Sequence, residues 1–145
     1  MAMNIKKVVI GGIVAGLVLN IVDFLSNYAL AARMKAETDA FKPGLSAQMS
    51  TTSAMVSYII MDFAMGVALV WTYAAIRPRF GSGPRTAIFA ALLFWLLALI
   101  FYAGYRQMGM MSPGLWWTFA FIGLVNFLIA AVAGAAVYSE DAATV

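Results

Sequence analysis

The chain has 145 residues, of which 64% are hydrophobic and only 10% are charged, and its mean hydropathy is +0.92. A soluble domain of this length cannot bury so much apolar surface, so the surplus is expected to face lipid or other proteins. The lack of cysteine and histidine excludes disulfides, thiol chemistry, histidine catalysis and most zinc sites. The net charge of +3 fits anionic lipid better than nucleic acid.

Four stretches are each long and apolar enough to cross a bilayer, which takes about 20 residues as a helix. They cover residues 8–32, 54–76, 86–105 and 115–138. The gaps between them hold most of the charges and the helix breakers Pro43-Gly44, Pro78, Gly81, Gly83 and Ser112-Pro113-Gly114. Two of the gaps are short, which favours neighbouring helices that run in opposite directions. We therefore expect one membrane domain over residues 1–145, an all-α antiparallel up-down bundle of four transmembrane helices.

The first stretch carries a polar stripe. Its members are spaced by four, four, three and four residues, which places them on one helix face: Gly12, Gly16, Asn20, Asp23 and Asn27. Gly12 and Gly16 form a GxxxG pair, which allows another backbone to approach closely. A carboxylate at the depth of Asp23 must be protonated, paired or in contact with water.

A short pattern from the first stretch recurs in two others. Ile21-Val22-Asp23-Phe24 is echoed by Ile60-Met61-Asp62-Phe63 and by Leu124-Val125-Asn126-Phe127. Asp62 shares a face with Gly66, and Asn126 shares one with Gly123 and Gly134. We expect an interior of small and polar residues in which Asp23 and Asp62 are close together.

The polar residues of these faces form a predicted intramembrane polar cluster: Asn20, Asp23, Asn27, Asp62 and Asn126. The cluster has two possible interpretations. It is either a proton- or cation-handling site, or a set of interhelical hydrogen bonds that only holds the helices together. Because no nucleophile–base arrangement is available without histidine or cysteine, we predict no catalytic residue, no enzyme activity, no metal site and no cofactor.

The segment Arg77–Arg85 is expected to be a basic turn. Its arginines, Arg77, Arg79 and Arg85, are predicted to contact anionic lipid on the cytoplasmic side. If both termini are cytoplasmic, the cytoplasmic side also holds Lys6 and Lys7. The opposite side then holds Arg33, Lys35, Lys42 and Arg106. The bias of five cations against four favours cytoplasmic termini.

The chain resembles a group of uncharacterised small bacterial membrane proteins with four spans. The likeness rests on residues 11–20, on Phe24 and Asn27, and on residues 70–81, Val-Trp-Thr-Tyr-Ala-Ala-Ile-Arg-Pro-Arg-Phe-Gly. The resemblance implies a four-span fold in the bacterial inner membrane and carries no activity. The layout is also similar to that of small multidrug transporters, which have four helices and an acidic residue in the first.

Three functions follow as hypotheses. The first is a structural or accessory subunit that packs in a homo-oligomer or a larger membrane complex, with the lipid bilayer and other membrane subunits as its partners. The second is a small transporter that couples to protons or cations through Asp23 and Asp62. The third is a binder of a lipid, quinone or pigment between helices, where Phe94, Trp95 and Phe101 offer flat surfaces.

Overall fold

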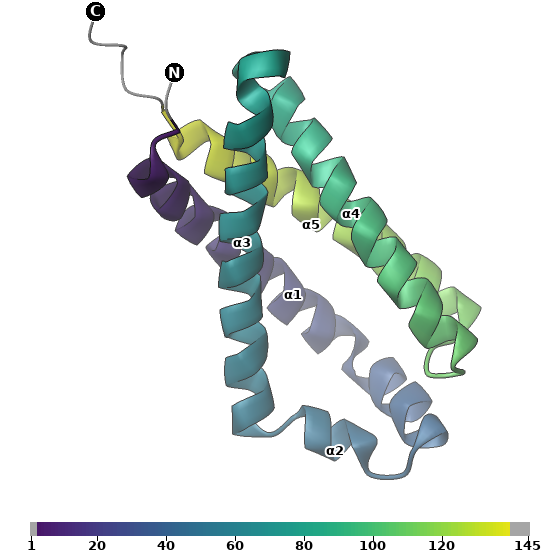
Figure 1. Ribbon diagram of the computed structural model, residues 1–145. Coiled ribbons are helices and arrows are strands. Elements are labelled where there is room, and N and C mark those ends of the chain that lie inside the picture. The colour runs from purple at the N-terminus through teal and green to yellow at the C-terminus, as the bar shows by residue number, and fades with distance from the viewer. Residues whose placement is uncertain (1–2, 140–145) are drawn as a thin grey trace, which may run out of the picture.

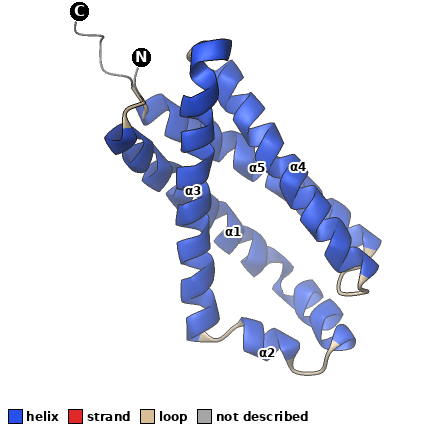
Figure 2. Cartoon of the chain, in the orientation of Figure 1, coloured by secondary structure: helices blue, strands red, loops and turns tan. Residues whose placement is uncertain are grey.

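The computed structural model describes residues 3–139, which are helical apart from short turns and the two ends (Figure 2). The elements are α1 (Ile5–Phe41), α2 (Leu45–Met49), α3 (Thr52–Phe80), α4 (Pro84–Gln107) and α5 (Pro113–Val137). Each helix except the short α2 is long and apolar enough to cross a membrane. The prediction of an all-α chain with four potential spans is confirmed.

The helices begin at residues that satisfy free backbone N–H groups. The side chains of Asn4, Thr51 and Ser112 accept hydrogen bonds at the first turns of α1, α3 and α5. The helix α4 follows Gly83 instead and has Pro84 in its first turn, where the missing N–H of proline costs nothing.

The helix α1 is longer than the predicted span and continues for nine residues past Ala32. Two pairs at i,i+4 spacing, Arg33–Glu37 at 3.3 Å and Lys35–Asp39 at 2.7 Å, suit a helical conformation in this charged stretch. The helix then ends before Pro43, because a residue preceding proline disfavours the helical conformation. At about 1.5 Å per residue, the length of α1 exceeds the thickness of a hydrocarbon core, which is about 30 Å. The charged end of α1 is therefore not needed to span such a core.

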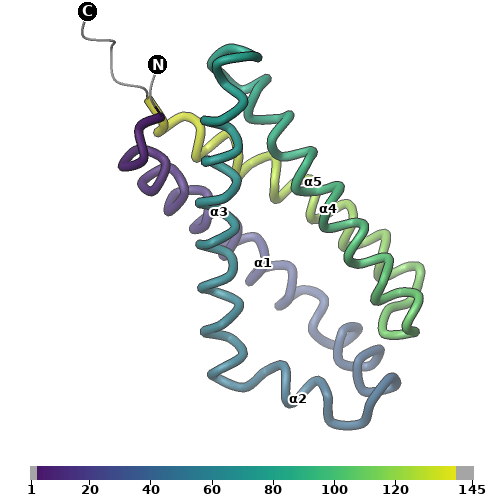
Figure 3. Tube along the Cα trace, viewed as in Figure 1, coloured from purple at the N-terminus to yellow at the C-terminus, as the bar shows by residue number. Residues whose placement is uncertain are grey.

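The long helices are not packed evenly (Figure 1). The helices α4 and α5 lie side by side, and α1 contacts both α5 and α3 but not α4. The helices α1 and α3 cross near the start of α1 and then diverge, and α2 lies on the connection between their distant ends (Figure 3). The start of α1, the end of α5 and the α3–α4 turn lie at the same end of the molecule.

The core is made mainly of small residues. Its buried side chains include eight alanines, accompanied by Leu69, Val70 and Tyr73 of α3. Small side chains let helix backbones approach one another, and close packing of this kind holds helices together in lipid, where burial of apolar surface supplies no driving force. The large apolar side chains lie on the outside, as Phe24, Phe101 and Phe121 do, each at least 70% exposed.

Candidate functional site: a polar cluster between three helices

Asp23 of α1 and Asn126 of α5 form the centre of the cluster. The side-chain amide of Asn126 donates a hydrogen bond of 2.8 Å to Oδ1 of Asp23 and a longer one of 3.5 Å to the carbonyl of Leu19. Asn126 is only 3% exposed. Two of the three residues that echo one another in the sequence are therefore in direct contact between α1 and α5.

The Oδ1 atom of Asn126 is buried and has no hydrogen-bond partner within residues 3–139. A buried acceptor without a partner costs about 1–3 kcal/mol. A protonated Asp23 has an O–H group that could satisfy this acceptor while the amide N–H continues to donate to the other carboxyl oxygen. Asn126 is thus chemically suited to both protonation states of Asp23.

Asp62 lies on α3, where that helix crosses α1. Its charge interacts electrostatically with the charge of Asp23, and its backbone carbonyl lies beside Gly16. The Asp62 side chain is half-buried and makes no hydrogen bond or ion pair among the described residues.

The two other asparagines of the stripe differ in their roles. The amide of Asn20 donates to the carbonyl of Gly16 at 2.9 Å and to the carbonyl of Ile59 on α3 at 3.4 Å, so it links α1 to α3. Asn27 is exposed and donates only to the backbone carbonyl of Asp23, one turn earlier in its own helix. The structure thus brings Asn20, Asp23, Asp62 and Asn126 together and leaves Asn27 at the edge.

The glycines of α1 meet glycines of α3 and α5. A Cβ atom at Gly66 would lie 2.4 Å from the carbonyl oxygen of Gly12 and 2.4 Å from the backbone nitrogen of Gly16. A Cβ atom at Gly134 would lie 2.9 Å from the carbonyl oxygen of Gly11. Both crossings therefore require glycine. Gly123 is different, because a Cβ atom there would meet only the Trp95 ring, at 3.9 Å.

Two of the three aromatic residues predicted as flat binding surfaces, Phe94 and Trp95 of α4, pack against α5. The indole N–H of Trp95 donates to the carbonyl of Ala120 at 2.8 Å, and the Phe94 ring lies 6.2 Å from the ring of Phe127. Phe101 instead points outward and is 73% exposed.

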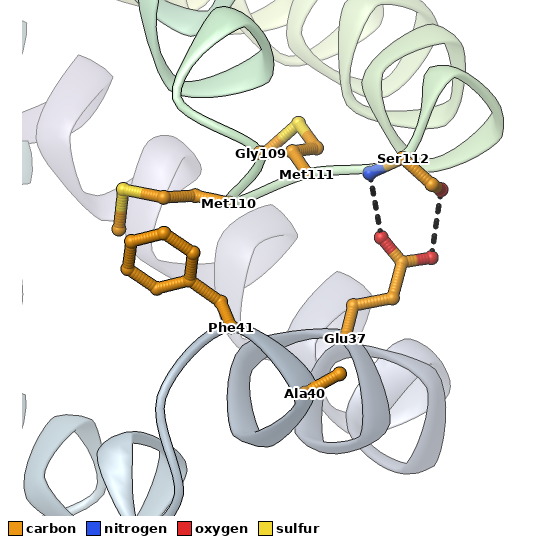
Figure 4. Close-up of a pocket in the computed structure, with 7 residues that line it drawn as sticks. All are labelled: Glu37, Ala40, Phe41, Gly109, Met110, Met111 and Ser112. Carbon is orange, nitrogen blue, oxygen red and sulfur yellow. Dashed lines mark hydrogen bonds between the residues drawn. The ribbon is translucent and has the colours of Figure 1, made fainter.

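A second polar network, absent from the sequence-based predictions, fixes the far end of α1. The carboxylate of Glu37 accepts hydrogen bonds from the backbone N–H of Ser112 at 2.9 Å and from its hydroxyl at 2.8 Å (Figure 4). Burial raises the pKa of Glu37, but the hydrogen bonds from Ser112 and Arg33 outweigh it and leave that pKa below its usual value. An open cavity of about 280 Å³ lies beside this contact, between Phe41 and the α4–α5 loop.

Asp39 makes the corresponding contact with α2. Its carboxylate accepts hydrogen bonds from Lys35 at 2.7 Å, from the Ser46 backbone N–H at 3.0 Å and from the Ser46 hydroxyl at 2.8 Å. These bonds lower the pKa of Asp39 to about 2. The only sequence signal for either network was the i,i+4 spacing of the charges, which does not reveal Ser46 or Ser112 as partners.

The predicted basic turn is shorter than expected, because α3 continues through Pro78 to Phe80. Pro78 cannot donate a helical hydrogen bond to the carbonyl of Ala74, and the helix ends two residues after it. Gly81 and Gly83 have positive φ angles of 85° and 118°, and the Tyr73 hydroxyl accepts a hydrogen bond of 3.1 Å from the Gly83 N–H. Arg79 and Arg85 are exposed on this turn, whereas the Arg77 guanidinium lies 5.5 Å from the centre of the Tyr138 ring.

The chemistry open to the cluster is that of carboxyl and amide groups. Within residues 3–139, no group of three or more acidic side chains is placed to hold a metal ion. Comparisons with protein-family models, with curated proteins and with solved structures found no match for this chain. The resemblance to small four-span proteins therefore rests on the stretches quoted for it.

Proposed function

We propose that the protein is a multi-pass membrane protein whose four long helices pass up and down through the bacterial inner membrane, with both termini in the cytoplasm. The contacts Gly11–Gly134 and Glu37–Ser112 support opposite directions for α1 and α5. The orientation is supported by the five cations at the end where α1 begins and α5 ends. At the other end, Arg33 and Lys35 are paired with acids.

Within this membrane, the protein is proposed to act as an accessory subunit that packs against further transmembrane helices, in a homo-oligomer or a larger complex. The observation that carries the proposal is the exposure of α3 between its first residue and its crossing with α1. From Thr52 to Met61 every residue except the half-buried Ala54 is exposed, and the stretch leads to Asp62, whose carboxyl group has no partner among the described residues. A donor from a neighbouring helix would remove the cost of this group in lipid.

The GxxxG pair is a less suitable contact for such a partner. Gly12 and Gly16 already contact Gly66 and Val67 within the same chain. The exposed stretch of α3 from Thr52 to Met61 is therefore the better surface for assembly.

Mass measurement after gentle solubilisation tests this function. We expect a species heavier than one chain, or a co-purified membrane protein, that persists in Asp62→Asn and is weakened about tenfold in Asp62→Leu. Thr72→Val is the matched control on the same helix, because the Thr72 hydroxyl is already bonded to the carbonyl of Ala68 at 2.9 Å. A monomer at all concentrations, with nothing bound, contradicts the proposal.

The second candidate function is coupling to protons or cations through Asp23 and Asp62. The contact between Asp23 and Asn126, with its unpartnered Oδ1 atom, favours it, because this pair suits both protonation states of the acid. Asp62 lies about 22 Å along α3 from Arg77, so in a core about 30 Å thick it is nearer to the opposite membrane surface. Protons would reach it more easily from that side.

Flux measurements in liposomes separate this function from the first. A pH-sensitive dye inside the vesicles should report proton entry with the unmodified protein and much slower entry with Asp23→Asn or Asp62→Asn. Flux that is unchanged in both variants removes the two acids from any transport mechanism. Absence of flux in the unmodified protein leaves the accessory-subunit function as the only candidate of the two.

A further inference from the structure

Five cations lie at the end of the molecule where α1 begins, α5 ends and α3 turns into α4 (Figure 1). They are Lys6 and Lys7 of α1, Arg77 and Arg79 of α3, and Arg85 of α4. The four acids of residues 3–139, at positions 23, 37, 39 and 62, all lie elsewhere. The two remaining acids of the chain, Glu140 and Asp141, lie outside the described residues, so this end carries a sequence charge of at least +3.

Three of these cations occupy positions that the helix dipole disfavours. Lys6 and Lys7 are in the first turn of α1 and Arg85 is in the first turn of α4, and neither turn contains an acid. The N-terminal end of a helix carries a partial positive charge, so cations there are repelled and anions attracted. This arrangement becomes favourable when an anion binds to the same end.

The α3–α4 turn also combines charge with exposed aromatic surface. The Arg85 guanidinium lies 5.8 Å from the centre of the Phe89 ring, and the Phe89 ring packs against Phe80 at 5.5 Å. Phe80 is 52% exposed and Phe89 is 40% exposed. A ligand at Arg79 and Arg85 would thus have its charged group beside the arginines and an apolar part along the two rings.

The turn itself is held in place by hydrogen bonds. Tyr73 accepts the Gly83 N–H, and the Thr86 hydroxyl donates to the carbonyls of Gly81, at 2.8 Å, and Phe80, at 3.3 Å. Arg79 and Arg85 make no ion pair among the described residues. Their guanidinium groups are therefore available for an external anion on a turn that is already ordered.

We propose that the α3–α4 turn binds the headgroup of an anionic phospholipid through Arg79 and Arg85, with the acyl chains against Phe80 and Phe89. The charge of the site and its adjacent apolar surface fit a lipid better than a free phosphate. Lys6 and Lys7 raise the positive potential at the same end. Since the cytoplasmic leaflet is the anionic one, this site would also hold the termini on the cytoplasmic side.

Native mass spectrometry of the detergent-solubilised full chain tests the proposal, with phosphatidylglycerol and phosphatidylcholine as probes. The unmodified protein should retain phosphatidylglycerol in preference to phosphatidylcholine. Each arginine removed should reduce that preference about fivefold, so Arg79→Gln/Arg85→Gln should reduce it roughly 25-fold. The control Lys42→Gln/Arg106→Gln removes two charges from the opposite end and should leave the preference unchanged.

Three results would overturn the proposal. The first is equal retention of the two lipids by the unmodified protein. The second is an equal loss of preference in both double variants, which would indicate a nonspecific effect of net charge. The third is displacement of phosphatidylglycerol by glycerol phosphate at similar concentration, which would indicate a site for phosphate alone. Circular dichroism of each variant verifies that the helices are intact.

Discussion

The crossing of α1 and α3 gives the most direct test of the structure. In Gly66→Ala, the new methyl group would lie 2.4 Å from the Gly12 carbonyl oxygen and the Gly16 nitrogen, and 2.8 Å from the Gly16 Cα. All three are backbone atoms, so no side-chain rotation relieves the clash. The helices must separate by about 1 Å to restore an ordinary contact of 3.4 Å.

This separation has a cost that can be estimated. Overpacking of a well-packed contact costs about 1–3 kcal/mol, and a gap of about 0.5–1 Å forfeits a quarter to a half of the dispersion energy of the surrounding contacts. Alanine also favours the helix over glycine by about 0.8–1 kcal/mol. We therefore expect Gly66→Ala to be destabilised by about 1–2 kcal/mol after this gain.

Gly104 provides the matched control, because it also lies within a helix and a Cβ atom there would meet nothing within 4 Å. Gly104→Ala should keep the gain in helix propensity without a clash and should be at least as stable as the unmodified protein. The difference between the two variants, about 2–3 kcal/mol, isolates the crossing from propensity.

Equilibrium unfolding in mild detergent with increasing dodecyl sulfate, followed by circular dichroism and tryptophan fluorescence, measures both variants. A double variant with Gly12→Ala should cost less than the sum of the single changes, because the first methyl group already separates the helices. If Gly66→Ala and Gly104→Ala have the same stability, α1 and α3 do not cross at these glycines.

The remaining predictions concern polar contacts between helices. Glu37→Gln should lower the unfolding free energy by about 1 kcal/mol, because a charge-assisted contact with Ser112 becomes a neutral one. Since the folded-state pKa of Glu37 lies below its unfolded value, its contribution is present above the unfolded pKa and is lost as pH falls through the folded pKa. Thermal melts should therefore show a smaller variant effect at about pH 3 than at pH 7, and an equal effect at both would contradict this. Trp95→Phe should cost about 1 kcal/mol by removing the hydrogen bond between the indole N–H and the Ala120 carbonyl, whereas the exposed Trp117→Phe should be nearly neutral in the same unfolding assay.

The sequence by itself determined that the chain has four helices able to cross a membrane. Apolar stretches of sufficient length separated by Pro43, Pro84 and Pro113 leave few alternatives, because every backbone polar group in lipid must be bonded within its own helix. Helical spacing also placed Gly12, Gly16, Asn20 and Asp23 on one face. These are local properties, set by repeat and length.

Tertiary structure decided how these faces are used. The GxxxG pair contacts Gly66 of the same chain, Asn126 reaches Asp23, and Asp62 is left without a hydrogen-bond partner among the described residues. The sequence could not show that Glu37 binds Ser112, 75 residues away. Such pairings depend on the angle at which helices cross and on which neighbour each one meets, and the periodicity of a single helix contains neither.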